Sequence, residues 1–336
     1  MHSSFLRRYH AQVRICLLTN QDLDGNDFPE DDWPCDPRPF LPDDEWHVAT
    51  LLENKTSVRK VEALIKQGFD LFFNLCDGPL GYGDPGIEVV RTLEKHGVPF
   101  TGASSKFFEP TRLQMKAACK KLGIATPKGV VVRNEDDIDK AVAALRFPMF
   151  VKYYSSYASV DISRNSRVQT EAGLRQQVRK ILSKHKAALV EEYIGGTECT
   201  VLVAENPMNS KKPTTYTPVQ YQFPEGETFK HENLKWVDYE GLMAFPVKDP
   251  VLSKRLRDES ARFFTELEGA SYGRCDIRVA EDGTPHMLEI NPNCGLYFEE
   301  KDYGSADFCL SLDPAGHFGF TQQLVKAAFT RAKSRV

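Results

Sequence analysis

The sequence predicts an α/β (α+β) protein that opens with a parallel sheet and continues into a region of mixed helices and strands. Two observations support this: a strand–helix–strand–loop–helix order over residues 13–96, and alternating strand patterns with amphipathic helices after residue 189. The 336 residues suffice for two or three domains with their own cores. We expect domains at residues 1–108, 109–189 and 190–336.

The composition indicates a soluble globular protein, with 41% hydrophobic and 27% charged residues. A net charge of -4 argues against a broad electrostatic contact with nucleic acid, although a few focused lysines can still bind a small anion. The eight cysteines are scattered, without a CxxC pair or Cys/His cluster, which argues against zinc and favours reduced thiols.

The N-terminal apolar run is too short and interrupted for a signal peptide or a membrane span. We therefore expect a cytoplasmic protein without a membrane partner. A mitochondrial address is an alternative with thin support in Arg7, Arg8 and Arg14.

The first segment reads as alternating strands and helices. Its elements in order are a buried strand at 13–19, a polar proline-rich loop at 21–44, a helix at 58–66, a strand at 69–75, a glycine-rich loop, and a helix at 86–96. Parallel sheets of this kind bind ligands beyond the carboxyl ends of their strands.

The rest of the chain carries helices and strands in a different order. We expect a helix carrying Lys116, a strand at 147–153, a helix at 171–183, a strand at 189–194, a helix at 251–267, two further strands, and a helix at 321–331. The long loops at 21–44 and 207–233 are interpreted as either lids or disordered insertions.

The most informative motif is the pair of runs 274–279 and 286–295. Asp-Gly at 282–283 between them is a hairpin signal, and such a hairpin sets Asp276 beside Glu289 and Asn291. Crowded oxygen ligands of this type suit magnesium. The alternative is the exposed alternation of an ordinary hairpin, which leaves the Asn-Pro-Asn-Cys-Gly run at 291–295 unexplained.

Two weaker motifs precede this hairpin. Lys152 ends an apolar strand and is followed by a Ser/Tyr-rich turn, which suits a phosphate chain, although Lys152 and Lys116 can equally be solvated surface lysines. The run 189–198 passes from a strand into Gly195-Gly196, which fits either a hinge that contacts adenine or a simple β-turn.

The order of these motifs resembles the ATP-grasp superfamily, and within it the D-alanine–D-alanine ligase-like branch. The resemblance covers about residues 69–295, and its most specific part is the Arg…Asp…Glu-x-Asn ending. The runs 98–104 and 123–127 are also similar to the family's "gipytGs" and "giptp" turns. The resemblance implies an ATP-grasp fold, with a Rossmann-like first domain and two lobes that hold ATP between them.

The resemblance also implies site residues and a reaction. By this resemblance, the phosphates are bound by Lys116, Lys152, Ser159 and Lys235, and the ribose is bound by Glu198. Adenine is contacted by Glu191 and by the backbone of Glu192 and Ile194. Two Mg²⁺ (or Mn²⁺) ions are held by Asp276, Glu289 and Asn291, and the oxyanion is stabilised by Arg274 and the Gly295 amide. ATP would activate a carboxylate as an acyl phosphate, which an amine then attacks, releasing ADP and phosphate. Small-molecule substrates, with amino acids favoured, and a homodimer through the first segment follow from the same resemblance.

The sequence departs from the D-alanine ligases where they contact amino acids. The family's aspartate–lysine pair reads Thr111-Arg112, its substrate-supporting serine is Ala158, and its short serine–leucine segment becomes a longer stretch at 296–307. We therefore hypothesise a carboxylate–amine ligase whose product is not D-alanyl-D-alanine. The alternatives are another ATP-grasp chemistry, such as a genuine D-alanine–D-alanine ligase or ligation to a non-amine nucleophile, and a nucleotide-binding regulatory protein without turnover.

Overall fold

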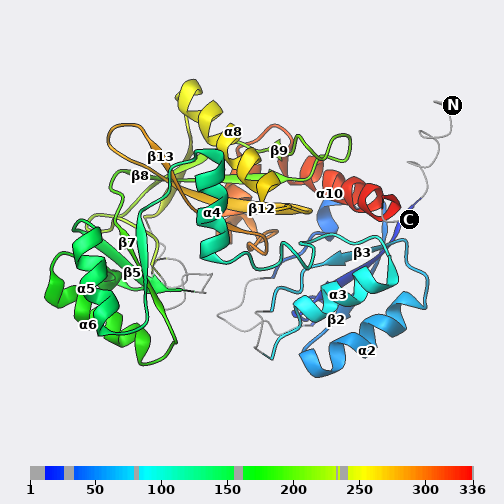
Figure 1. Ribbon diagram of the computed structural model, residues 1–336. Helices are drawn as coiled ribbons and strands as arrows, with labels where there is room; N and C mark the ends of the chain where they lie inside the picture. Colours follow the sequence, from blue (N-terminus) through cyan, green and yellow to red (C-terminus); the bar gives the residue numbers. More distant parts are fainter. Residues whose placement is uncertain are drawn as a thin grey trace.

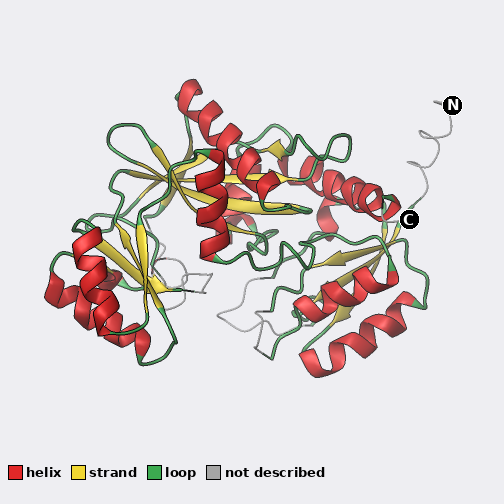
Figure 2. Cartoon of the chain, viewed as in Figure 1, coloured by secondary structure: helices red, strands yellow, loops and turns green. Residues whose placement is uncertain are grey.

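The computed structural model describes residues 12–25, 34–78, 83–154, 162–231, 234 and 241–334. The described residues form three sheets with their helices, and Figures 1 and 2 show these sheets in separate lobes of one molecule. The first sheet lies in the N-terminal part, the second in the middle of the chain, and the largest in the C-terminal part.

The N-terminal sheet is parallel, with strand order β2-β1-β3. Its elements are β1 (Arg14–Thr19), η2 (Arg38–Phe40), β2 (Glu45–Thr50), α2 (Asn54–Ile65), β3 (Leu71–Asn74) and α3 (Ile87–His96). The central strand β1 is buried from its second residue onward, because sheet neighbours and helices cover it on all sides. The predicted parallel α/β arrangement is confirmed.

The middle sheet is antiparallel, with strand order β4-β7-β5-β6. Its elements are β4 (Gly129–Val132), α5 (Glu135–Ala144), β5 (Met149–Tyr153), η3 (Arg164–Ser166), β6 (Arg167–Val168), α6 (Glu171–Leu182) and β7 (Ala188–Glu192). Helices α5 and α6 lie together on one side of it (Figure 1), and their buried side chains form a separate core with the strands.

The largest sheet has the order β11-β10-β8-β12-β13, with β9 paired to β8. Its elements are β8 (Thr197–Ala204), β9 (Thr214–Thr215), β10 (Val219–Gln222), β11 (Met243–Pro246), β12 (Tyr272–Val279) and β13 (Pro285–Asn291). The helices against it are α4 (Arg112–Leu122), α8 (Pro250–Glu266), α9 (Ser305–Ser311) and α10 (Gly316–Lys333), and the short η4 (Glu300–Asp302) precedes α9.

Both faces of this sheet are buried, as the side chains of β8 show. Cys199, Val201 and Val203 belong to the core that includes α4 and α8, whereas Leu202 and Ala204 belong to the core that includes α9 and α10. Successive side chains of a strand point to opposite faces, so β8 is apolar on both faces and reads as a continuous hydrophobic run.

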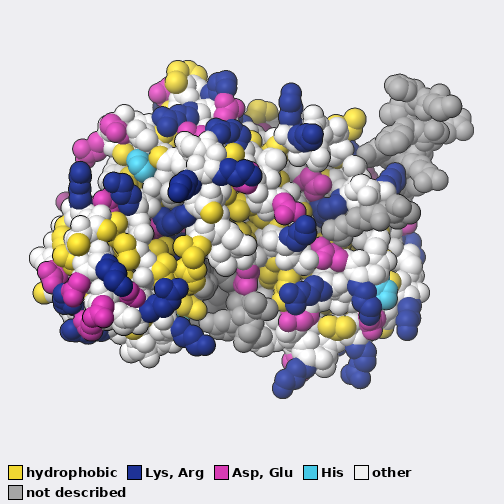
Figure 3. All heavy atoms as spheres, viewed as in Figure 1, with side chains coloured by type: hydrophobic (Ala, Val, Ile, Leu, Met, Phe, Trp, Pro, Cys, Tyr) yellow, Lys and Arg dark blue, Asp and Glu magenta, His cyan; other side chains and the backbone are white. Residues whose placement is uncertain are grey.

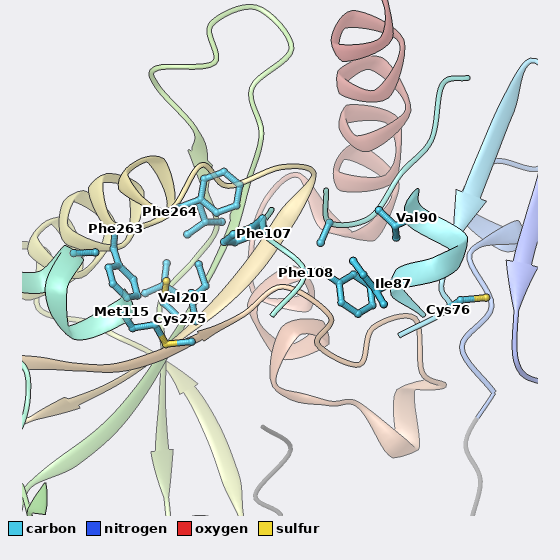
Figure 4. Packing of buried hydrophobic residues seen from close by; sticks show 14 of the residues in the cluster. Cys76, Ile87, Val90, Phe107, Phe108, Met115, Val201, Phe263, Phe264 and Cys275 are labelled. Carbon is cyan, nitrogen blue, oxygen red and sulfur yellow. The ribbon is translucent and has the colours of Figure 1, made fainter. Parts of the chain in front are cut away.

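The first of these cores continues from the large sheet toward the N-terminal sheet. Figure 4 shows Phe107 packed beside Phe264, and Phe108 on the side of Ile87. The Phe107 and Phe264 rings meet edge to face with centroids 5.2 Å apart. The segment between α3 and α4 therefore joins the two parts of the molecule by buried aromatic side chains.

The elements expected from the sequence at residues 13–19, 58–66, 69–75, 86–96, 147–153, 171–183, 189–194, 251–267 and 321–331 are confirmed, with shifted ends. Strands β2 and β4 and helix α5 were not expected. The 207–233 stretch contains β9 and β10 and is therefore not a structureless insertion in its described part. The division into three domains stays a prediction; β7 crosses its expected boundary at residue 189.

Charged side chains of both signs are interspersed over the face drawn in Figure 3, without a continuous basic surface there. This agrees with the net charge of -4. Among the described residues, the helices fall short of the length and apolar character that crossing a bilayer requires.

Candidate active site

The β12–β13 hairpin brings the predicted metal-binding side chains together. Asp276 lies opposite Glu289 in the antiparallel register, and Arg274 lies opposite Asn291. A bulge follows Asp276, so the pairing shifts before Ile277. The predicted hairpin is confirmed, and the period of two along each strand places these groups on neighbouring positions.

Arginines bind the two carboxylates. The Arg274 Nε and Nη2 donate to the two oxygens of Asp276 at 3.0 and 2.8 Å, and Thr200 Oγ1 donates to the same carboxylate at 2.9 Å. Glu289 forms an ion pair with Arg112, the first residue of α4. These charge-assisted bonds hold both carboxylates in fixed orientations.

The chemistry of these donors fits magnesium. Asn291 Oδ1 accepts the Asn293 N–H at 2.9 Å, and each carboxylate has further lone pairs beyond those its arginine uses. Within the described ranges, His, Cys, Asp and Glu side chains do not gather in groups of three or more that would hold a metal. Two carboxylates and one amide do not fill the octahedral coordination of magnesium. In such sites, phosphate oxygens of the substrate supply further ligands.

A second cluster joins Lys116, Lys152 and Glu191 from α4, β5 and β7. The Nζ atoms of Lys116 and Lys152 lie 2.5 and 2.6 Å from the two oxygens of Glu191, whose side chain is 5% exposed. Burial alone would raise the pKa of the Glu191 carboxyl, but Lys152 and Lys116 outweigh burial and lower that pKa to about 2. The carboxylate is therefore ionised and paired with both lysines.

Glu198, the expected ribose-binding residue, belongs to a third cluster. Arg278 Nη1 donates to Glu198 Oε2 at 3.3 Å, and Lys230 Nζ lies 3.5 Å from Glu198 Oε1. Arg278 also donates to the carbonyl of Gly196 at 3.0 Å, so it fixes the turn that precedes Glu198.

One pocket connects the three clusters. Its lining includes Lys152, Glu191, Glu192, Ile194, Glu198, Asp276 and Glu289, together with Lys230, Arg278 and apolar side chains such as Phe150, Phe229 and Leu288. Gly295 follows β13, where a side chain would meet the Phe298 ring at 2.7 Å. Ser159 and Lys235 lie outside the described residues.

Three cations of this region were not assigned from the sequence: Arg112, Lys230 and Arg278. Arg278 follows Asp276 by two residues on β12, and this spacing was a usable signal. Arg112 was noted only as a departure from the family pattern, because its partner Glu289 is 177 positions away in sequence. No hydrophobic periodicity around Lys230 indicated that its side chain would lie at the site.

The overall architecture is that of known ligases of the ATP-grasp type. The chain superposes on the D-alanine–D-alanine ligase of Bacillus anthracis complexed with ATP with a TM-score of 0.68 at 16% identity, covering 96% of this chain and 100% of that one. D-alanyl-alanine synthetase A of Vibrio cholerae gives a TM-score of 0.67 at 18% identity, with 95% and 99% covered. These likenesses confirm the predicted ATP-grasp fold.

Sequence comparison identifies the family. The family model described as "D-ala D-ala ligase C-terminus" matches residues 118–298, more than half of the chain, so the chain belongs to this family. The D-alanine–D-alanine ligase of Xanthomonas axonopodis pv. citri is 27% identical over 241 residues, which cover 70% of this chain and 72% of that protein. An uncharacterised protein of Sinorhizobium fredii is 31% identical over 235 residues, covering 67% and 66%. The chain is an ATP-grasp ligase, an enzyme that uses ATP to form a carbon–nitrogen bond, as the sequence predicted.

Proposed function

We propose that this enzyme joins a carboxylate to an amine, forming an amide or a dipeptide through an acyl phosphate and releasing ADP and phosphate. The observation that carries the proposal is the register of the β12–β13 hairpin, which pairs Asp276 with Glu289 and Arg274 with Asn291 beside a pocket lined by Lys152 and Glu191. Catalysis of this kind requires positioning and charge neutralisation, and no covalent nucleophile on the enzyme.

Asp276, Glu289 and Asn291 would hold two Mg²⁺ ions, which neutralise phosphate charge when bound. Arg274 lies beside Asp276 with a guanidinium that stays protonated, and it stabilises the oxyanion that forms when the amine attacks. The Gly295 amide contributes to the same stabilisation, and the absence of a side chain at 295 leaves the backbone accessible.

Lys116, Lys152, Ser159 and Lys235 would bind the phosphates, and Glu198 the ribose hydroxyls. Glu191 and the backbone of Glu192 and Ile194 would contact adenine. The Glu192 N–H already donates to the Lys128 carbonyl at 2.9 Å, which leaves the Glu192 carbonyl as its candidate adenine acceptor. Lys116 and Lys152 each bind one oxygen of Glu191 in this structure, and because an ammonium has three donors, phosphate oxygens would accept from donors that Glu191 does not use.

The substrates are small molecules, and amino acids are the favoured class. D-alanine is the first candidate to test because D-alanine–D-alanine ligases are among the relatives of this chain. The departures at Ala158 and at 296–307 support a different product. A homodimer through the N-terminal domain and a cytoplasmic location belong to the same proposal.

A magnesium-dependent ADP-release screen over pairs of amino acids, D-alanine included, tests the function. Robust release with D-alanine would identify a genuine D-alanine–D-alanine ligase, and release with another pair supports the product hypothesis. Absence of release with every pair would favour a nucleotide-binding protein without turnover.

Glu289→Gln tests the metal assignment in the same assay. The variant should lower turnover by roughly 100-fold or more while ATP binding is largely retained, because the amide is a poorer cation ligand. Glu259→Gln is the matched control, since Glu259 lies on α8 with a 13% exposed side chain paired to Arg255. An active Glu289→Gln enzyme would show that the metal assignment is wrong.

A further inference from the structure

Lys230 is a buried cation to which the proposed roles assign no function. Its side chain is 8% exposed, and its ammonium lies 3.2 Å from the centroid of the Tyr221 ring. Nζ donates to Ser305 Oγ at 3.1 Å, and Glu198 Oε1 lies 3.5 Å away, at the outer limit of hydrogen bonding. Lys230 thus contacts β8, β10 and the start of α9.

The charge of Lys230 is less well compensated than those of the other cations here. Lys116 and Lys152 approach Glu191 to 2.5 and 2.6 Å, and Arg274 approaches Asp276 to 2.8 Å. Glu198 is likewise shared, between Lys230 and Arg278, but its contacts are longer, at 3.5 and 3.3 Å. Burial lowers the pKa of the Lys230 ammonium although Glu198 acts in the opposite direction.

Lys230 also lines the same pocket as Asp276, Lys152 and Glu289. Its hydrogen-bond partner Ser305 belongs to the stretch 296–307, where this sequence departs from the D-alanine ligases. The ammonium therefore lies between the expected ribose-binding carboxylate and the rewritten segment.

We propose that Lys230 binds an anionic oxygen group of a ligand, either the terminal phosphate of the nucleotide or a carboxylate of the amino-acid substrate. The assignment rests on the proposed function in that both ligands are expected in this pocket. An ammonium has three donors, and an anion in the pocket would accept from those that Ser305 does not use. Ribose hydroxyls at Glu198 would weaken the 3.5 Å contact and leave Lys230 to that anion.

A ligand-binding role and a purely structural role of Lys230 predict different effects of its removal on the stability of the protein. Burying an incompletely compensated lysine costs free energy, so Lys230→Met should leave the ligand-free protein at least as stable as the wild type. If Lys230 instead supported the fold through Glu198 and Ser305, the same change would lower the melting temperature. Lys254→Met is the control, because Lys254 has a 76% exposed side chain on α8 and its removal changes the net charge equally.

The experiment measures binding by calorimetry in the presence of Mg²⁺ for wild type, Lys230→Met, Lys230→Arg and Lys254→Met. The ligands are ADP, a non-hydrolysable ATP analogue, and alanine or aspartate added to the analogue-bound protein. Loss of one charge-assisted hydrogen bond should weaken binding about tenfold or more. Lys230→Arg should recover part of the affinity, and Lys254→Met should behave as wild type.

The pattern of losses identifies the anion. Weaker binding of the ATP analogue with ADP unchanged indicates the terminal phosphate. Weaker amino-acid binding with both nucleotides unchanged indicates that Lys230 binds a substrate carboxylate. A loss of affinity confined to aspartate indicates that this group is the side-chain carboxylate of aspartate. Equal weakening of ADP and the analogue would show that Lys230 acts only through Glu198, and no change would remove any ligand role; either result overturns the proposal.

A failure of the Lys230 proposal can be distinguished from a failure of the proposed ligase function. A wild-type protein that binds nucleotide but never releases ADP contradicts the ligase proposal, while the Lys230 comparison still gives its answer from nucleotide binding. A wild type that binds none of these ligands contradicts both.

Discussion

At the scale of single residues, the clearest feature is the sharing of Glu191 between Lys116 and Lys152. The three side chains come from three elements and meet in a buried position, with Glu191 itself 4% exposed. A buried carboxylate with two cations is stable only while all three remain paired, because any one left alone would carry an uncompensated charge. Glu191 therefore sets the positions of both lysines.

We predict that Glu191→Gln destabilises the fold by about 3 kcal/mol near neutral pH, since it leaves the buried Lys152 and the partly buried Lys116 without their carboxylate. The pKa of Glu191 falls from the ordinary 4.5 to about 2 on folding. A lowered pKa stabilises the fold above about pH 4.5, and this contribution is lost as pH falls toward 2. Urea unfolding should therefore show a gap between wild type and variant that narrows below pH 4.5.

The matched control is Glu135→Gln. Glu135 also contacts two cations, Arg175 and Arg179, but its side chain is 54% exposed. Solvent screens this pair, so its removal should leave stability nearly unchanged. An equal effect of both variants would contradict the central position assigned to Glu191.

At the scale of elements, the turn between β7 and β8 places two of the predicted nucleotide-binding residues, Glu191 and Glu198, at either end. Gly196 has φ of 87°, and a Cβ there would lie 2.1 Å from the Val279 carbonyl oxygen. Arg278 holds the same turn through the Gly196 carbonyl. Gly196, the second glycine of the pair that fits either a hinge or a simple β-turn, is thus packed against the end of β12 in this structure.

We predict that Gly196→Ala lowers the free energy of unfolding by about 2 kcal/mol or more, because a left-handed conformation and a backbone clash both oppose a side chain. Gly195→Ala is the control, since a Cβ at 195 would meet no atom within 4 Å. Chemical denaturation of both variants provides the measurement. Equal stability of the two would mean that the turn rearranges freely.

At the scale of the whole molecule, helix α10 joins the N-terminal sheet to the largest sheet. Its residues Phe320 and Leu324 share one core with Ile15 and Phe73 of the first sheet and with Tyr272 of the large sheet. Figure 1 shows α10 running beside the large sheet and above the N-terminal sheet. The two parts are therefore expected to unfold together rather than as independent domains.

We predict that Phe320→Ala costs about 3–5 kcal/mol, since Phe320 is fully buried and contacts the rings of Tyr216, Tyr272 and Tyr297. Hydrogen exchange should show protection falling by the same free energy in β1 and β12, because one shared core stabilises both strands. Phe318→Ala on the same helix is the control, with 53% exposure. A loss confined to β12 would show that the sheets are independent.

The sequence by itself determined the elements that have strong periodic patterns. The buried run of β1, the amphipathic helix α8 and the Asp-Gly hairpin of β12 and β13 follow from local spacing, and so does the pairing of Asp276 with Glu289. Strand β2 was missed because it mixes polar and apolar residues and is only partly buried, and β4 was missed because its apolar run is three valines long. Helix α5 begins with an Asn134 cap and three acidic residues, a start signal that was available but not used.

Only the tertiary structure decided how the charges of the site are paired. Arg112 meets Glu289 across 177 positions, Lys116 and Lys152 meet at Glu191, and Lys230 reaches Ser305 across 75 positions. Local spacing fixes which face of an element a side chain occupies, but it carries no information on which distant element will cover that face. The proximity of the side chains proposed to bind metal could therefore be predicted from one hairpin, whereas their partners depend on how the three sheets pack.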